Sequence, residues 1–271
     1  APTDASAQLY SAIRVRDPRL RDEVARLSGD QEHIRQAAEF FLFLADVHRL
    51  ERLLAHRGQR MAFWPRTALH FAILDAGIAA SYLALTAEAL GYGVCFIGGV
   101  LNGVEALTDL LGLPPGVLPV VGLAVGVPDE EGHPRPRLPR RLVVHEDRYR
   151  PYAAEDLEEA YRAMAPYSRV GDWNRVLRRY FAEGGTMEAR EKPYGKVLSR
   201  QGFDPDLPQG APFYSLGALL EEALAEARGV LFRKGEVWLE EEARAFRGEG
   251  RPGEALLMAL RKARGEVPDW P

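Results

Sequence analysis

The sequence predicts a globular protein of the α+β class. Two continuous apolar runs of strand length, 37–46 and 117–128, predict strands that are buried on both faces. A long run of small and apolar residues, 67–90, predicts a buried helix that ends at Gly91. Strand and helix signals are mixed along the chain without the regular period of βαβ units, which argues against a doubly wound parallel sheet.

Composition indicates a soluble protein. Of 271 residues, 46% are hydrophobic and 27% are charged, and the formal net charge of -4 gives no reason to expect nucleic acid or an acidic membrane as partner. Asp75 and Glu88 interrupt the longest apolar stretch, 72–90, so we interpret it as a core helix rather than a membrane span. The single cysteine, Cys95, cannot form an internal disulfide, and this suits the cytoplasm. Its apolar surroundings predict a small core residue.

The basic residues are almost all arginine. Only four of the 35 are lysine, and asparagine occurs only twice. A low content of thermolabile residues is compatible with a thermophilic source, and a GC-rich genome explains the same bias equally well.

The remaining elements follow from capping and stop signals. Asp17 and Pro18 predict the start of a helix that Gly29 ends. We expect two domains, residues 1–203 and a helical C-terminal extension over residues 204–271. Further signals predict strands at 9–15 and 94–97 and helices at 47–57, 104–111, 153–165, 173–182, 188–200 (broken at Pro193 and closed by Gly202), 216–228, 236–247 and 253–264.

Several kinds of chemistry find no support in the sequence. The six histidines show no HExxH and no Cys/His ligand spacing, so no metal site is predicted. GxSxG and the phosphate-binding GxxxxGK[ST] are absent. The segment GYGVCFIGG is not a dinucleotide fingerprint, because its glycines do not open a helix after a strand.

Three segments carry the functional signal. Gly98 and Gly99 end a short strand, where they provide either a turn or a bare main chain that a planar ligand can approach. In PRPRLP, alternation puts Arg135 and Arg137 on one side of an extended segment, which suits a phosphate, although two such arginines alone more often lie in a solvated loop. The N-terminal APTDASAQ is a loop rich in hydrogen-bonding side chains.

Together these segments resemble the FMN-dependent nitroreductases, in particular the NADPH-flavin oxidoreductase and oxygen-insensitive nitroreductase branch. The resemblance covers residues 1–202 and rests on the order and spacing of the N-terminal region, GYGVCFIGGVLNG, PRPRLP and REKPYGKVLSRQGF. It implies an α+β fold with a mixed, mainly antiparallel sheet flanked by helices. It also implies a domain-swapped homodimer with an FMN in each of two interfacial clefts.

The resemblance also implies roles for individual residues. The glycine N–H groups would face the redox edge of the flavin, and the two arginines would bind its phosphate. Lys192 lies where the family often has an arginine for NADPH, and Leu101 lies where it often has an arginine near the substrate mouth. The implied cofactor-binding residues are Thr3, Ser6, Gln8, Gln31, His33, Phe96, Ile97, Gly98, Gly99, Arg135 and Arg137.

The implied reaction is ping-pong hydride transfer from NADPH or NADH to FMN and then to nitroaromatics, quinones or free flavin. The chemistry takes place on the cofactor, so no catalytic side chain is expected. The family's N-terminal [HR]-x-S-x-R motif does not occur in this sequence, through either truncation or genuine loss. Its absence motivates the alternative of a flavin-fold module that binds FMN or a partner without turnover.

Overall fold

The computed structural model describes residues 1–129, 134–168 and 171–203. Contacts within the chain divide it into two compact units. Among the described residues, the first unit comprises 1–126 and 194–203, and the second comprises 127–193 apart from its two gaps. The predicted helices beyond residue 203, and with them the predicted domain boundary, lie outside the described residues.

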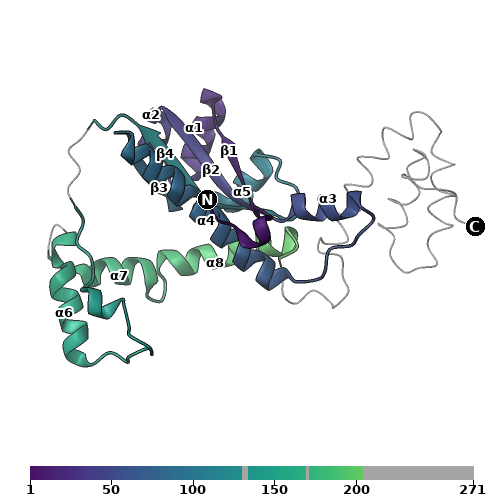
Figure 1. Ribbon diagram of the computed structural model, residues 1–271. Helices are drawn as coiled ribbons and strands as arrows, with labels where there is room; N and C mark the ends of the chain where they lie inside the picture. The colour runs from purple at the N-terminus through teal and green to yellow at the C-terminus, as the bar shows by residue number, and fades with distance from the viewer. Residues whose placement is uncertain (130–133, 169–170, 204–271) are drawn as a thin grey trace, which may run out of the picture. The chain divides into compact units, whose positions relative to one another are not determined.

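A four-stranded antiparallel sheet forms the centre of the first unit, with the strand order β1-β2-β4-β3 (Figure 1). β2 is central because it pairs Tyr10 of β1 with Ala45 on one side and Glu39 with Val125 of β4 on the other. Its register shifts after Phe43. The bounds of the strands are β1 Tyr10–Arg14, β2 Glu39–Asp46, β3 Gly93–Ile97 and β4 Val117–Gly126.

Both faces of the sheet are covered, which explains the continuous apolar run of β2. Phe40 and Leu42 project into a core with α1, α2 and α5, whereas Phe43 on the opposite face packs with alanines of α4. A third cluster joins Leu9 and Val104 to the end of α8. The helices are α1 Pro18–Leu27, α2 Glu32–Gln36, α3 His48–His56, α4 Pro65–Ala89, α5 Val104–Leu110 and α8 Thr186–Arg200.

α1 begins as the sequence predicts. The Asp17 carboxylate accepts hydrogen bonds from the N–H groups of Arg19 (2.8 Å) and Leu20 (2.9 Å), and Pro18 occupies the first turn. Gly29 follows the helix with φ +90°, a conformation that glycine adopts without strain.

The long helix α4 is buried on one face only, which corrects the expectation of a fully buried helix. Alanines such as Ala76 and Ala80 face the sheet with no exposed surface, whereas Leu74, Tyr82 and Leu85 on the opposite face are about half exposed or more. Among the described residues, α4 alone is long and apolar enough to pass a test for a membrane span, and a core helix passes the same test. Its contacts with all four strands identify it as a core helix.

The described part of the second unit contains the α-helices α6 Ala154–Met164 and α7 Trp173–Phe181 and the first half of α8. The sequence predicted both ends of α6 and of α7 to within one residue. α8 corrects the prediction of a break, because the helix runs through Pro193 instead of stopping there. The limit between the two units falls at this proline.

Candidate functional site

The two glycines after β3 have different surroundings, although they are adjacent in the chain. They open a 3-10 segment, η2 (Gly98–Gly103), that packs against α1. A side-chain carbon built at Gly98 would meet no atom within 4 Å, so its main chain is open. The same carbon at Gly99 would overlap the Ser28 carbonyl oxygen and the Gln31 amide. Gly99 therefore allows close packing, and Gly98 offers the main chain to a ligand.

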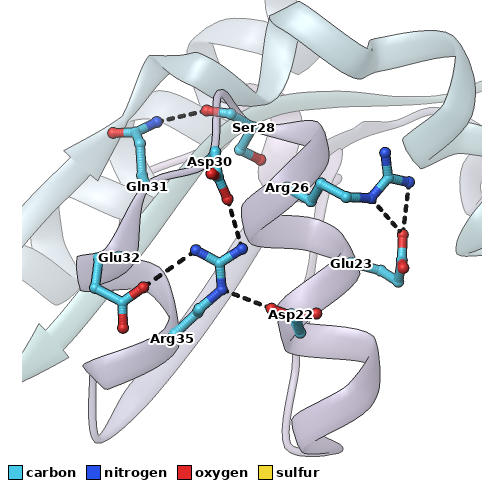
Figure 2. A network of polar contacts seen from close by, with 8 residues as sticks. All are labelled: Asp22, Glu23, Arg26, Ser28, Asp30, Gln31, Glu32 and Arg35. Atoms are coloured by element: carbon cyan, nitrogen blue, oxygen red, sulfur yellow. Dashed lines mark hydrogen bonds and ion pairs between the residues drawn. The ribbon is translucent and has the colours of Figure 1, made fainter.

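This packing brings the Gln31 side chain next to Gly99. The Nε2 group of Gln31 donates a hydrogen bond of 2.6 Å to the carbonyl oxygen of Ser28, at the end of α1 (Figure 2). Gln31 itself precedes the first residue of α2. Residues 68 positions apart in sequence thus share one corner of the first unit.

Arg35 fixes the segment on both sides of Gln31. Its guanidinium group donates to Asp22 on α1 (2.6 Å), to Asp30 (2.6 Å) and to Glu32 (3.2 Å), as Figure 2 shows. Asp30 has a left-handed backbone, with φ +54°. Three charged contacts to one guanidinium group therefore hold the turn in which Gln31 lies.

The other residues predicted around the glycines differ in their exposure to solvent. Phe96 is 47% exposed and His33 is exposed, so both side chains are accessible to a ligand. Ile97 is 1% exposed and packs in the core, so only its main chain is available. Leu101 is partly buried against two core clusters. Cys95 is exposed on β3, an edge strand, so the prediction of a core cysteine is wrong.

The N-terminal segment before β1 has an unusual backbone. Residues Asp4–Ser6 form a short 3-10 turn, η1. Ala5, Ser6 and Gln8 have positive φ values of 45°, 56° and 52°. Left-handed backbone costs about 1 kcal/mol at a residue other than glycine, so other contacts must hold this segment. Within it, Gln8 N–H donates to Thr3 Oγ1 at 3.3 Å, and the Ser6 and Gln8 side chains are exposed.

The predicted phosphate-binding arginines lie in the second unit. Arg135 and Arg137 are both exposed, and the Arg135 guanidinium carbon lies 5.5 Å from the centre of the Tyr167 ring. Arg137 donates to the carbonyl oxygens of Arg135 (3.2 Å) and Pro136 (3.1 Å). A cavity of about 490 Å³ is lined by Arg137, Arg140, Tyr167, Trp173 and apolar side chains around them. Lys192 is exposed on α8.

A buried carboxylate organises the same unit. Asp156 on α6 is 5% exposed and accepts hydrogen bonds from Arg150 (2.6 Å), Arg141 and the N–H of Ala153 (2.9 Å). The Arg150 hydrogen bond, followed by those of Arg141 and Ala153, lowers the pKa of Asp156 well below its usual range. The interaction fixes the loop after the arginine segment to the start of α6.

Among the described residues, no group of three His, Cys, Asp or Glu side chains is placed to hold a metal ion. The features that suit a ligand are the open main chain at Gly98, the amide of Gln31 beside Gly99, and the exposed arginines of the second unit. Open backbone at the end of a strand accommodates a flat ring system, and arginine suits a phosphate group.

Comparisons with known proteins define the class to which this chain belongs. A model of the nitroreductase family matches residues 1–127. The oxygen-insensitive NADPH nitroreductase of Salmonella typhimurium is 36% identical over 204 residues, 72% of this chain and 81% of that protein. The FMN reductase (NADPH) of Bacillus subtilis is 36% identical over 151 residues, 55% of this chain and 61% of that protein.

Solved structures agree with these relatives. The nitroreductase NfrA1 from Bacillus subtilis has a TM-score of 0.66 with 29% identity, over 73% of this chain and 84% of that one. The NADPH:FMN oxidoreductase from Vibrio harveyi, solved with NAD+, has a TM-score of 0.65 with 29% identity, over 74% of this chain and 83% of that one. The chain belongs to the nitroreductase family.

Proposed function

We propose that this chain is an FMN-dependent NAD(P)H oxidoreductase that reduces nitroaromatics, quinones or free flavin. The observation that carries the proposal is the open main chain at Gly98 beside the anchored Gln31. It occurs in a chain whose relatives are named as NADPH-dependent flavin reductases and nitroreductases. FMN, when bound, would supply the acceptance of hydride from NAD(P)H and its donation to the second substrate.

The residues of the chain would bind and orient the cofactor. The Gly98 N–H and the Gln31 amide would meet the polar edge of the flavin, because Gly98 leaves that main chain uncovered. The N-terminal residues Thr3, Ser6 and Gln8 would contribute hydrogen bonds to the flavin or its tail. The main chain of Ile97 and the side chains of Phe96 and His33 would complete the surroundings of the ring.

Arg135 and Arg137 would hold the FMN phosphate. Both are exposed, and arginine binds phosphate with two parallel hydrogen bonds where the geometry allows it. Lys192 would attract the phosphate of NADPH as a point charge, without the fork of an arginine. We place Leu101 near the entrance for the second substrate.

We further propose a cytoplasmic homodimer. The exposed apolar face of α4 supports the dimer, because a stable protein seldom leaves large apolar side chains in a row without a partner. The single cysteine supports a reducing compartment. The arginine-rich composition supports a heat-stable protein from a thermophile, which a thermal melt would test.

The purified full-length chain tests the proposed reaction directly. We expect a yellow protein, or one that turns yellow with added FMN, whose flavin absorbance is bleached by NADPH or NADH without oxygen. A quinone added afterwards should restore the absorbance, and each nicotinamide should be oxidised before the quinone reacts. Colourless protein that neither takes up FMN nor oxidises NADPH with a quinone would contradict the proposal and favour a module that binds a partner without turnover.

A double variant tests the phosphate assignment. Arg135→Ala with Arg137→Ala should lower the FMN content at least about tenfold, because two charged hydrogen bonds to phosphate are lost. Arg148→Ala with Arg162→Ala removes two exposed arginines of the same unit and serves as the control. Unchanged flavin content in the first variant would reassign the phosphate site.

A further inference from the structure

We propose that Asp75 is a positioning residue for FMN, and that Arg49 assists it. Their charged side chains hold the main chain of residues 4–10 in the conformation that presents Ser6 and Gln8 to a ligand. This inference rests on the proposed function, since it takes these side chains to be flavin contacts. Neither Asp75 nor Arg49 belongs to the set that the family resemblance implied.

Asp75 is a buried acid whose two oxygens both bind the main chain of one segment. It lies on α4 between Ala72 and Ala76 and is 2% exposed. Its Oδ2 accepts a hydrogen bond from Leu9 N–H at 2.9 Å, and its Oδ1 accepts one from Asp4 N–H at 3.3 Å. A carboxylate at this position therefore fixes both ends of a turn that spans six residues.

Arg49 acts on the carbonyl groups of the same segment. Its Nη2 donates to the carbonyl oxygens of Gln8 and Tyr10, the latter at 2.9 Å. Its Nη1 is oriented by Ser11 Oγ (3.1 Å) and Asp46 Oδ2 (3.3 Å). The acid thus binds N–H groups and the guanidinium binds carbonyl groups, so the two charges constrain complementary parts of one backbone.

The segment needs such support because of its own conformation. Ala5, Ser6 and Gln8 are all left-handed, and none of them is a glycine. The side chains of Ser6 and Gln8 are exposed, so packing of these side chains does not hold the turn. The restraint comes through the main chain, which leaves the polar groups of these side chains accessible. A turn held in this way can present the Ser6 and Gln8 side chains to a ligand without a change in its backbone conformation.

Asp75→Asn tests the role with little change in volume. An amide has one acceptor oxygen, so one of the two N–H groups would lose its partner and would face an NH2 group instead. We expect the backbone amides of residues 4–9 to exchange hydrogen faster in the FMN-free variant. We also expect FMN to bind about tenfold more weakly, measured by titration of flavin fluorescence, because an ordered contact segment is lost.

Two further variants separate positioning from a general loss of stability. Asp109→Asn makes the same chemical change at an exposed site of the same unit. It should leave the hydrogen exchange of residues 4–9 and the FMN affinity at the wild-type level. Asp75→Asn combined with Ala5→Gly should recover part of the FMN affinity, since glycine favours the left-handed backbone that Ala5 adopts. A protein destabilised as a whole would instead exchange hydrogen faster at amides outside residues 4–9 as well.

The outcomes distinguish this inference from the proposed function. Wild-type protein that binds no FMN would overturn both. Wild-type protein that binds FMN, with Asp75→Asn binding equally well, would overturn the positioning role alone, and so would unchanged exchange of residues 4–9. If Asp75→Asn does not fold, Arg49→Gln removes the second support from a half-exposed position and should produce the same two effects.

Discussion

At the scale of single residues, alanine substitutions at Gly98 and Gly99 should differ in their effects on stability and on FMN binding. Gly98→Ala should leave the free energy of unfolding within about 0.5 kcal/mol of wild type, since its methyl group meets no protein atom. It should nevertheless weaken FMN binding, because the methyl group occupies the space left for the ring. Gly99→Ala should lose about 1–3 kcal/mol of stability, since its methyl group overlaps the Ser28 carbonyl oxygen.

Urea unfolding and flavin titration of the two alanine variants measure these effects, and each variant is the control for the other. A Gly98→Ala protein that binds FMN like wild type would remove Gly98 from the site. A fully stable Gly99→Ala protein would mean that η2 can move away from α1 at little cost.

Asp156 gives a prediction of pH dependence. The pKa of the Asp156 carboxyl is lowered in the folded protein, chiefly by Arg150. Its negative charge therefore contributes its full stabilisation above about pH 4, where Asp156 is ionised in the unfolded chain as well. Asp156→Asn should therefore lower the melting temperature at pH 7. The difference from wild type should shrink as the pH falls from about 4 toward the lowered folded pKa.

Melting curves between pH 7 and 2.5 measure this difference, and Glu158→Gln provides the control at an exposed position of the same helix. A gap between wild type and Asp156→Asn that stays constant down to the lowest pH would show that the arginine contacts do not depend on the charge of Asp156.

At the scale of elements, the close packing of α4 against the sheet depends on its small residues. Ala76 packs against Phe43 and Leu123 with no exposed surface, so the helix lies close to the sheet. Ala76→Leu should cost about 1–3 kcal/mol through overpacking. Ala89→Leu makes the same change at an exposed position and should be nearly neutral. Equal stability of the two variants, measured by urea unfolding, would contradict this close packing.

Elements with local signals could be predicted from the sequence. The Asp17 cap, the glycine stops and the apolar runs of β2 and β4 depend on neighbours in the chain, and their predicted positions are confirmed. Pro193 shows the limit of this reasoning, because a local rule predicts a break where the helix continues. The environment of Cys95 could not be predicted either, since edge position depends on strand order rather than on local composition.

The candidate site was predictable to a similar degree. The family resemblance placed Gln31 and Gly99 in one flavin site, which stays a prediction, and the structure brings the two residues together. The anchoring of residues 4–10 was not predictable, because it depends on Asp75, which is 66 positions from its partner Leu9. The only local signal was an acid, Asp75, in the middle of an apolar helix. Such an acid requires a partner, and a sequence does not tell which one.

At the scale of the whole molecule, the exposed face of α4 gives a test of the proposed dimer. Tyr82 and Leu85 are 53% and 64% exposed on the side of the helix that faces away from the sheet. Because both side chains are already partly buried, covering the exposed part of each contributes about 1–2 kcal/mol. Leu110 provides a control, because it is an exposed apolar residue at the end of α5.

Sedimentation equilibrium at micromolar concentration should give the mass of two chains for wild type and for Leu110→Lys. Tyr82→Asp with Leu85→Lys should give the mass of one chain, because charged side chains would have to be buried without partners in the interface. The same variant should also lose FMN if residues of both copies surround the flavin, as the family resemblance implies. A wild-type monomer would contradict the proposed dimer, and a monomeric variant that retains FMN would place the whole binding site within one chain.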